Sequence, residues 1–253
     1  MMNYRLALTF AAALAVASCS SSPDESRVPL TEAEAMYQQA QEQMASGSLT
    51  SARVTLEDFL TRYPFGPYAE QVQLDLIYLT YKLDDIQKAL ANIDRFLRLN
   101  PNHRDIDYVM YMRGMVNQRA EYSAIQEMVG VDRSDRDPSF AKQAFEDFSN
   151  LLREFPESKY AADAKQRMVW LKSRLAQYEL AVAQYYMKRE AYLAAANRGR
   201  YVLEYFSNTP EVEAALAIMV ESYDQMGLDD LREQARATLR KNYPNNSLAN
   251  ANN

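Results

Sequence analysis

A short pattern that returns along the chain constrains its fold more than any other feature of the sequence. Four segments align without gaps, and each carries an alanine and, eight residues later, a leucine. Three of them end at a proline, and a shorter fifth copy covers residues 233–244. Repeats of this kind are typical of solenoid proteins, in which each structural unit packs only against its neighbours. The alanines are Ala52, Ala89, Ala144 and Ala195, and the leucines are Leu60, Leu97, Leu152 and Leu203.

Each copy has the properties of one helix in a helical hairpin. The small alanine allows a neighbouring helix to approach, and the leucine can fill the seam between the two helices. Proline ends a helix because it lacks the amide hydrogen. The chain has only six glycines, and no segment alternates β-branched and polar residues between turns as strands do. We therefore expect an all-α superhelix of about five hairpins and ten helices, which resembles a tetratricopeptide repeat array.

Local signals place several ends of the expected helices. Thr31 and Glu34 form a capping box that opens the first helix, and Gly47 is its expected end. Pro67 has the position expected for the first residue of the third helix. Residues 158–190 contain no proline or glycine, which predicts one helix of about twice the usual length. The stacked hairpins should present a concave face suited to extended peptides or partner helices.

The folded part divides into two sets of repeats. We expect N-terminal repeats over residues 31–128 and C-terminal repeats over residues 139–244, with a charged loop at residues 129–138 between them. The loop alternates aspartates with arginines, whereas a calcium-binding EF-hand loop needs a glycine and differently spaced oxygen ligands. A loop whose charges pair with one another is therefore the preferred interpretation. The Asn-rich residues 245–253 predict a disordered tail.

The first residues of the chain have the features of a bacterial secretory signal. Arg5 is the only charge before residue 24, and an apolar run over residues 6–16 leads through small residues to Cys19. The run is too short to span a membrane, which takes about 20 residues. The segment resembles a lipobox, which implies that residues 1–18 are removed and that Cys19 carries N-acyl and S-diacylglycerol lipid. An incidental thiol is the alternative, and residues 19–30 read as a flexible tether.

Charge and composition exclude several classes of function. Removal of residues 1–18 takes away one positive charge, which leaves 27 basic against 34 acidic residues and a net charge of −7. Nucleic-acid binding needs a basic surface that this chain lacks. His103 is the only histidine and follows a turn, so we read it as a solvated surface residue. No catalytic triad, zinc spacing or phosphate-binding loop occurs, and we expect no enzyme activity, no metal and no cofactor besides the covalent lipid.

A dense aromatic cluster follows the first repeat. It contains Tyr63, Phe65 and Tyr68, with Gly66 and Pro67 between them, and Tyr78 and Tyr81 come shortly afterwards. Most of the 18 tyrosines must serve core packing with their hydroxyls at the rim. Tyrosine also forms binding surfaces, because it offers a large rigid ring with a polar tip. For residues 63–68 both interpretations, core packing and the wall of a groove, remain open.

Four long motifs resemble the BamD family, the lipoproteins of the β-barrel assembly machinery. They cover residues 62–68, 71–78, 107–114 and 130–138, and the resemblance extends from the lipobox almost to the end of the chain. The motifs are long and unusual, so the resemblance is specific. It implies a role in folding and inserting β-barrel proteins into the outer membrane. The serine that follows Cys19 favours, by the same resemblance, an anchor in the outer membrane with the repeats facing the periplasm.

The resemblance also implies partners and contact residues. The C-terminal half would hold the periplasmic domain of BamA, with Arg198 and its neighbour Asn197 at the matching positions. A solvated helix charge is the plain alternative for Arg198. The groove beside Tyr63, Phe65, Gly66, Pro67 and Tyr68 would take BamC or segments of unfolded outer-membrane β-barrel substrates. BamE is a further implied partner.

Two other functions are alternatives to the role in β-barrel assembly. Another repeat lipoprotein, such as a pilus-secretin pilotin, would share the lipobox and the repeats but lack the motifs at residues 62–68 and 130–138. A cell-wall-modifying enzyme would need a catalytic pair, whereas the acidic residues here lie scattered at repeat spacing. The presence of BamA in the same assembly would distinguish these possibilities.

Overall fold

The computed structural model describes residues 31–126 and 136–250. Within these ranges the chain forms ten α-helices and one short 3₁₀ helix, with no strand, so the expected all-α fold is confirmed. The signal segment, Cys19, the tether and most of the charged loop lie outside the described residues. The helices are α1 (Glu32–Ala45), α2 (Leu49–Arg62), α3 (Ala69–Lys82), α4 (Ile86–Leu99), α5 (Ile106–Gln126), α6 (Ser139–Glu154), α7 (Ala161–Lys188), α8 (Tyr192–Tyr205), α9 (Val212–Gln225) and α10 (Asp229–Asn242).

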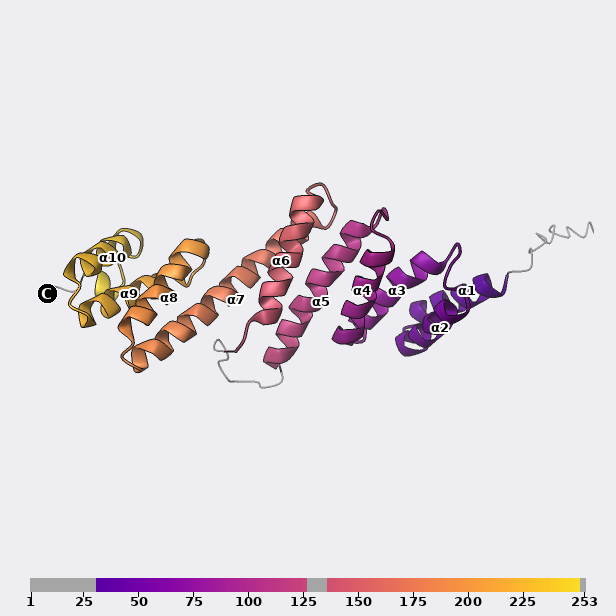
Figure 1. Cartoon of the computed structure of the whole chain (residues 1–253), viewed down its shortest axis with the longest axis horizontal. Coiled ribbons are helices and arrows are strands. Elements are labelled where there is room, and N and C mark those ends of the chain that lie inside the picture. Colours follow the sequence, from indigo (N-terminus) through magenta and orange to yellow (C-terminus); the bar gives the residue numbers. More distant parts are fainter. Residues whose placement is uncertain (1–30, 127–135, 251–253) are drawn as a thin grey trace, which may run out of the picture.

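The helices pair into five hairpins that follow one another in an elongated row, with α1 and α2 at one end and α9 and α10 at the other (Figure 1). Each helix packs mainly against the helices before and after it in the sequence. The two ends of the row lie far apart in Figure 1. A surface on the first hairpins is therefore separate from a surface on the last ones.

The repeat alanines lie in the core of the first four hairpins. Ala52, Ala89, Ala144 and Ala195 are all fully buried. The residues four and seven positions after each alanine are also fully or nearly buried. The repeat leucines, eight positions after each alanine, were expected to fill the seam between the two helices, but they are only partly buried at its edge. The reason is helical geometry, because positions four and seven after the alanine share its face and position eight turns away from it. The inner residues are Leu56 and Phe59, Ile93 and Phe96, Phe148 and Leu151, and Gly199 and Val202.

Two of the described helices, α5 and α7, are much longer than the 14 residues that most of the others have. The expected long helix is confirmed as α7, which has 28 residues. Helix α5 has 21 residues, which the spacing of the prolines did not predict. Gly114 lets α5 approach α6 closely, since a Cβ atom at this position would lie 2.5 Å from the ring of Phe148.

The helix ends agree with the sequence in part. Thr31 caps α1, and its hydroxyl accepts a hydrogen bond from the amide of Glu34 at 3.2 Å. Gly47 follows α1 with φ +78°, a conformation that favours glycine. The prediction for Pro67 is wrong, because α3 begins at Ala69 and Pro67 still belongs to the preceding turn.

The prediction of a disordered tail is wrong for residues 245–250. Ser247–Ala249 form a 3₁₀ helix, and Ala249 is fully buried against α9 and α10. Arg240 Nε donates to the carbonyl oxygen of Ala249 at 2.9 Å, and Asn246 Nδ2 donates to Glu213 Oε1 at 2.8 Å. This turn therefore covers apolar surface of the last hairpin. Among the described residues, no helix is long and apolar enough to cross a membrane.

Candidate partner-binding surfaces

The aromatic corner at residues 63–68 connects α2 to α3. The Tyr63 ring packs against Phe59 with centroids 5.4 Å apart, and the Tyr68 ring stacks on Tyr37 of α1 at 5.0 Å. Both tyrosines are thereby partly buried against the first hairpin. The side chain of Phe65, in contrast, is 89% exposed beside Gly66, whose φ is +133°. The corner therefore combines two packed tyrosines with one phenylalanine that projects into solvent.

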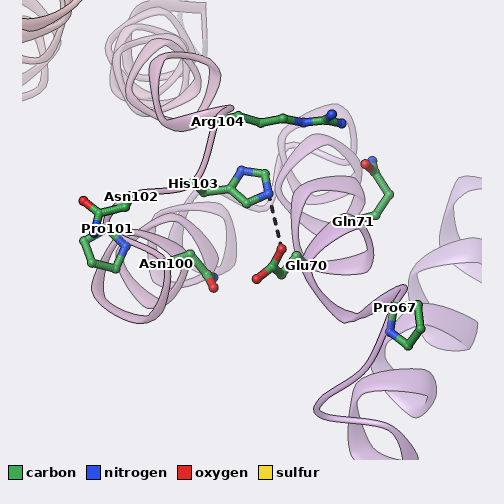
Figure 2. A pocket seen from close by; sticks show the side chains of 8 residues that line it. All are labelled: Pro67, Glu70, Gln71, Asn100, Pro101, Asn102, His103 and Arg104. Atoms are coloured by element: carbon green, nitrogen blue, oxygen red, sulfur yellow. Dashed lines mark ion pairs between the residues drawn. The ribbon is translucent and has the colours of Figure 1, made fainter.

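A cavity of about 620 Å³ lies beside this corner, between the start of α3 and the turn from α4 to α5 (Figure 2). Of the five predicted groove residues, only Pro67 lines it. His103 Nε2 lies 3.4 Å from Glu70 Oε2, and its Nδ1 accepts a hydrogen bond from the amide of Asp105 at 3.1 Å. The imidazole also lies edge-on against the ring of Phe96. His103 was expected to be solvated, but it is mostly buried and connects the α4–α5 turn to α3.

A second cavity, of about 310 Å³, shares Gln71 and Arg104 with the first. It is lined by Tyr78, Tyr108 and Tyr160, which come from α3, α5 and the residue before α7. The two cavities thus form a polar, tyrosine-lined path along the first helices of successive hairpins. This path is a more extended candidate groove than the corner at residues 63–68.

A row of aromatic contacts, which we name the tyrosine seam, continues this path between α5 and α7. Tyr111 stacks on Tyr160 at 4.7 Å and donates to Asp163 Oδ2 at 2.6 Å. Further along, Tyr122 stacks on Trp170 at 4.4 Å. The seam was not predicted, although its α5 residues have the three- and four-residue spacing of a single helix face. These residues are Tyr108, Tyr111, Met115, Gln118 and Tyr122.

Asp75 joins the first hairpin to α3. Its carboxylate accepts hydrogen bonds from Gln41 at 2.7 Å, Gln71 at 2.9 Å and Tyr37 at 3.3 Å. Burial raises the pKa of Asp75 despite these donors. Burial, together with the charge of Asp75, raises the pKa of Tyr37 to about 12. The network orients the Tyr37 ring on which Tyr68 stacks, so it stabilises the packed side of the aromatic corner.

Arg198 lies on α8, in the hairpin before the last. Its Nη1 atom donates to Glu179 Oε2 of α7 at 2.8 Å, and this hydrogen bond raises the pKa of Arg198. The Glu179 side chain is only 7% exposed, whereas that of Arg198 is 41% exposed. Arg198 is thus not an isolated solvated charge. It belongs to an interhelical ion pair with a buried acid, and part of its guanidinium remains accessible.

The register of the repeat explains this pair. Arg198 lies three residues after the repeat alanine Ala195, as Asp147 follows Ala144 and Thr55 follows Ala52. Thr55 Oγ1 donates to Gln43 Oε1 at 2.9 Å, and Asp147 Oδ1 accepts from Arg113 Nε at 2.7 Å. In each case the bond reaches the first helix of the same hairpin. We call such a bond a clasp, and in the second hairpin Asn92 forms none with the described residues.

Asn197 and several exposed apolar side chains lie on α8 together with Arg198. Asn197 Oδ1 accepts from Arg200 at 3.0 Å, and Asn197 also lines a shallow, mostly apolar cavity that reaches Met226. Leu193 is 61% exposed, and the exposed rings of Tyr201 and Tyr205 lie 4.4 Å apart. An exposed charge within apolar and aromatic surface is the composition that protein interfaces favour.

The described residues offer no site for metal chemistry. No group of three or more His, Cys, Asp or Glu side chains lies close enough together there to hold an ion. The aspartates at positions 132 and 135 of the charged loop lie outside the described residues. The features that the structure does present are clefts, aromatic rings and clasps, which suit recognition of other chains.

Comparisons with known proteins agree with this description. A family model described as "YfiO: Outer membrane lipoprotein" matches residues 30–239. An outer membrane protein assembly factor BamD from Vibrio cholerae is 45% identical over 224 residues, which are 88% of this chain and 92% of that protein. The BamD of Neisseria meningitidis serogroup A is 39% identical over 244 residues, 95% of this chain and 91% of that protein.

Two solved structures are more distant from this chain. A tetratricopeptide repeat protein of Thermus thermophilus is 15% identical with a TM-score of 0.39, covering 86% of this chain and 95% of its own. The pilus biogenesis factor PilW is 12% identical with a TM-score of 0.36, covering 87% of this chain and 97% of its own. Neither likeness bears on function, whereas the family model and the sequence relatives cover most of the chain. The chain therefore belongs to the YfiO family of outer membrane lipoproteins, together with the BamD assembly factors that it resembles.

Proposed function

We propose that this protein is a scaffold lipoprotein of the β-barrel assembly machinery and helps to fold and insert β-barrel proteins into the outer membrane. The observation that carries the proposal is the match over most of the chain to relatives named as outer membrane protein assembly factors. The row of hairpins supports a scaffold role, because it places separate surfaces at opposite ends of the molecule (Figure 1). The pilotin alternative is not favoured, since the motifs and the sequence relatives are those of assembly factors.

The anchor in this proposal is the lipid on Cys19, with N-acyl and S-diacylglycerol chains. Each buried CH₂ group contributes about 0.8 kcal/mol, so several acyl chains hold a protein firmly at a membrane. The tether of residues 19–30 then keeps the repeats near the outer membrane on its periplasmic side. Its 12 residues reach at most about 40 Å when fully extended.

The C-terminal repeats would bind the periplasmic domain of BamA through Arg198 and Asn197. Arg198 is available to an acidic partner, because its side chain stays 41% exposed while it donates to Glu179. The exposed apolar side chains around it would provide the buried area of the interface. BamC and BamE are further partners of the same complex in this proposal.

The N-terminal repeats would hold BamC or an extended segment of an unfolded β-barrel substrate. Phe65 supports this role through its exposure. The second cavity, lined by Tyr78, Tyr108 and Tyr160, provides rings against which an aromatic side chain can stack. The double substitution Tyr63→Ala and Phe65→Ala should weaken binding of a substrate peptide with a C-terminal aromatic residue, measured by fluorescence anisotropy. Unchanged affinity in the folded double variant would remove the corner from the binding surface.

The direct test of the function is an affinity purification of the native lipoprotein in detergent, followed by mass spectrometry. We expect BamA in nearly stoichiometric yield, accompanied by other members of the assembly machinery. A chain carrying Cys19→Ala, made without its signal segment, provides the control for contacts formed only in the membrane. Recovery of pilus or cell-wall proteins without BamA would contradict the proposed function.

A further inference from the structure

A cavity of about 450 Å³ lies between α4, α5 and α6 and shares no lining residue with the two cavities of the tyrosine-lined path. Its floor is the carboxylate of Asp147, a residue with no exposed surface. This carboxylate accepts from Arg113 Nε and Asn117 Nδ2, both at 2.7 Å, and from Gln143 Nε2 at 3.4 Å. One buried acid therefore fixes three polar side chains that line the same cavity.

Each of these three side chains keeps hydrogen-bonding capacity that the described residues do not use. Arg113 donates through Nε, which leaves its two terminal nitrogens without a partner among the described residues. Asn117 is 2% exposed and donates through Nδ2, so its Oδ1 atom retains its acceptor capacity toward the cavity that it lines. The Oε1 atom of Gln143 is likewise not used. Donors and acceptors that are both oriented and open are the features of a built polar site.

The rest of the lining indicates what the site can accept. Leu90 of α4 and Phe140 of α6 are partly buried apolar walls. Asp94 contributes an exposed carboxylate that forms no ion pair with the described residues. A peptide group offers one acceptor and one donor, which match the guanidinium of Arg113 and the amide oxygens. An apolar side chain fits between the two walls, and a neighbouring cation fits Asp94.

We propose that this cavity binds an extended segment of a partner protein, in which an apolar residue is followed by a basic one. The C=O of the segment accepts from the free nitrogens of Arg113, and its N–H donates to Asn117 Oδ1. The apolar side chain lies against Leu90 and Phe140, and the basic side chain pairs with Asp94. This site is separate from the surface around Arg198, and it does not depend on the proposed contact with BamA.

The test uses the folded protein and a fluorescein-labelled hexapeptide, Ser-Thr-Leu-Lys-Thr-Ser, in fluorescence anisotropy. Two control peptides carry N-methyl-leucine, which lacks the N–H donor, or glutamate in place of lysine. We expect measurable binding of the first peptide, and at least threefold weaker binding of each control peptide. Equal binding of all three, or no binding of the first at millimolar protein, would overturn the proposal.

Variants of the protein test which side chains of the cavity contact the peptide. Arg113→Lys can keep the ion pair with Asp147 but loses the planar set of donors, so we expect roughly tenfold weaker binding. Asp94→Asn removes no contact made in the fold, and we expect roughly threefold weaker binding of the lysine peptide. Asp230→Asn, at an exposed acid on α10, is the matched control and should change nothing. If Arg113→Lys does not fold, Asp94→Asn still decides the matter, because unchanged affinity in this variant contradicts the proposed site.

Discussion

The third and fourth hairpins use the same register of the repeat for opposite arrangements of charge. In the third hairpin the acid, Asp147, lies on the second helix, and Arg113 reaches it from the first. In the fourth hairpin the arginine, Arg198, lies on the second helix, and the acid, Glu179, lies on the first. The acid is the buried member of both clasps, with 0% and 7% of its side chain exposed.

The two arginines are accessible in different surroundings. The Arg113 side chain is 25% exposed and opens into a cavity bounded by three helices. The Arg198 side chain is 41% exposed on α8, a helix that also carries the exposed side chains of Leu193, Tyr201 and Tyr205. A buried acid thus orients an arginine in each hairpin, but one arginine faces a pocket and the other a broad surface. The first suits a narrow peptide segment, and the second suits a folded domain.

The largest expected effect is the loss of the buried acid in the third hairpin. Asp147→Ala leaves Arg113 and Asn117 without their shared acceptor, and we expect the free energy of unfolding to fall by about 3 kcal/mol. Urea denaturation followed by circular dichroism measures this change. Glu146→Ala, at the exposed neighbouring position, is the control and should have little effect. A loss below about 1 kcal/mol would mean that the clasp contributes little to the fold.

A smaller effect is expected from closer packing of the same hairpin. Gly114→Ala places a Cβ atom 2.5 Å from the Phe148 ring, which must move. We expect a loss of about 1–3 kcal/mol in the free energy of unfolding, because overpacking of a tight core is destabilising. The additional substitution Phe148→Leu should cost less in the Gly114→Ala background than in the original protein. Additive losses in a double-mutant cycle would show that the ring does not limit the approach of α5 and α6.

The smallest effect concerns Asp163, an accessible acid that contrasts with the two buried ones. Burial acts to raise its pKa, but hydrogen bonds from Tyr111 and Arg167 outweigh this effect and lower the pKa below the usual range. Its contribution to stability is therefore present above the pKa of the unfolded chain and is lost as the pH falls through the lowered folded pKa. The stability difference from Asp163→Asn should stay constant between pH 7 and pH 5 and shrink below about pH 4. An unchanged difference at pH 3 in urea denaturation would contradict the lowered pKa.

The sequence predicted the helices of the third and fourth hairpins but not the ion pairs that join them. The repeat alanines and the uninterrupted residues 158–190 are local signals, and both gave correct helices. The partners of Asp147 and Arg198 lie 34 and 19 residues earlier in the chain, so the clasps depend on how helices pack. The partial burial of His103 and the order of residues 245–250 were missed for the same reason. Both result from surfaces that exist only once the hairpins are stacked.

The candidate surfaces were predictable to different degrees. The resemblance indicated Arg198 and the corner at residues 63–68, yet it could not show that Tyr63 and Tyr68 pack inward while Phe65 projects outward. The α5 side of the tyrosine seam was visible as a periodic stripe, but the rings that it contacts, Tyr160 and Trp170, come from the residue before α7 and from α7 itself. A stripe on one helix does not reveal which helix faces it.

The most direct test of the account is a charge exchange in the fourth hairpin, with binding of the BamA periplasmic domain measured by calorimetry. Arg198→Glu alone places a second acid against Glu179 and should weaken both the fold and the binding. The double variant Glu179→Arg and Arg198→Glu restores an ion pair within the hairpin but turns the accessible charge negative. We expect this variant to regain most of its thermal stability and still to bind BamA at least tenfold more weakly than the original protein. Recovery of binding together with stability would show that Arg198 only supports the fold and does not contact the partner.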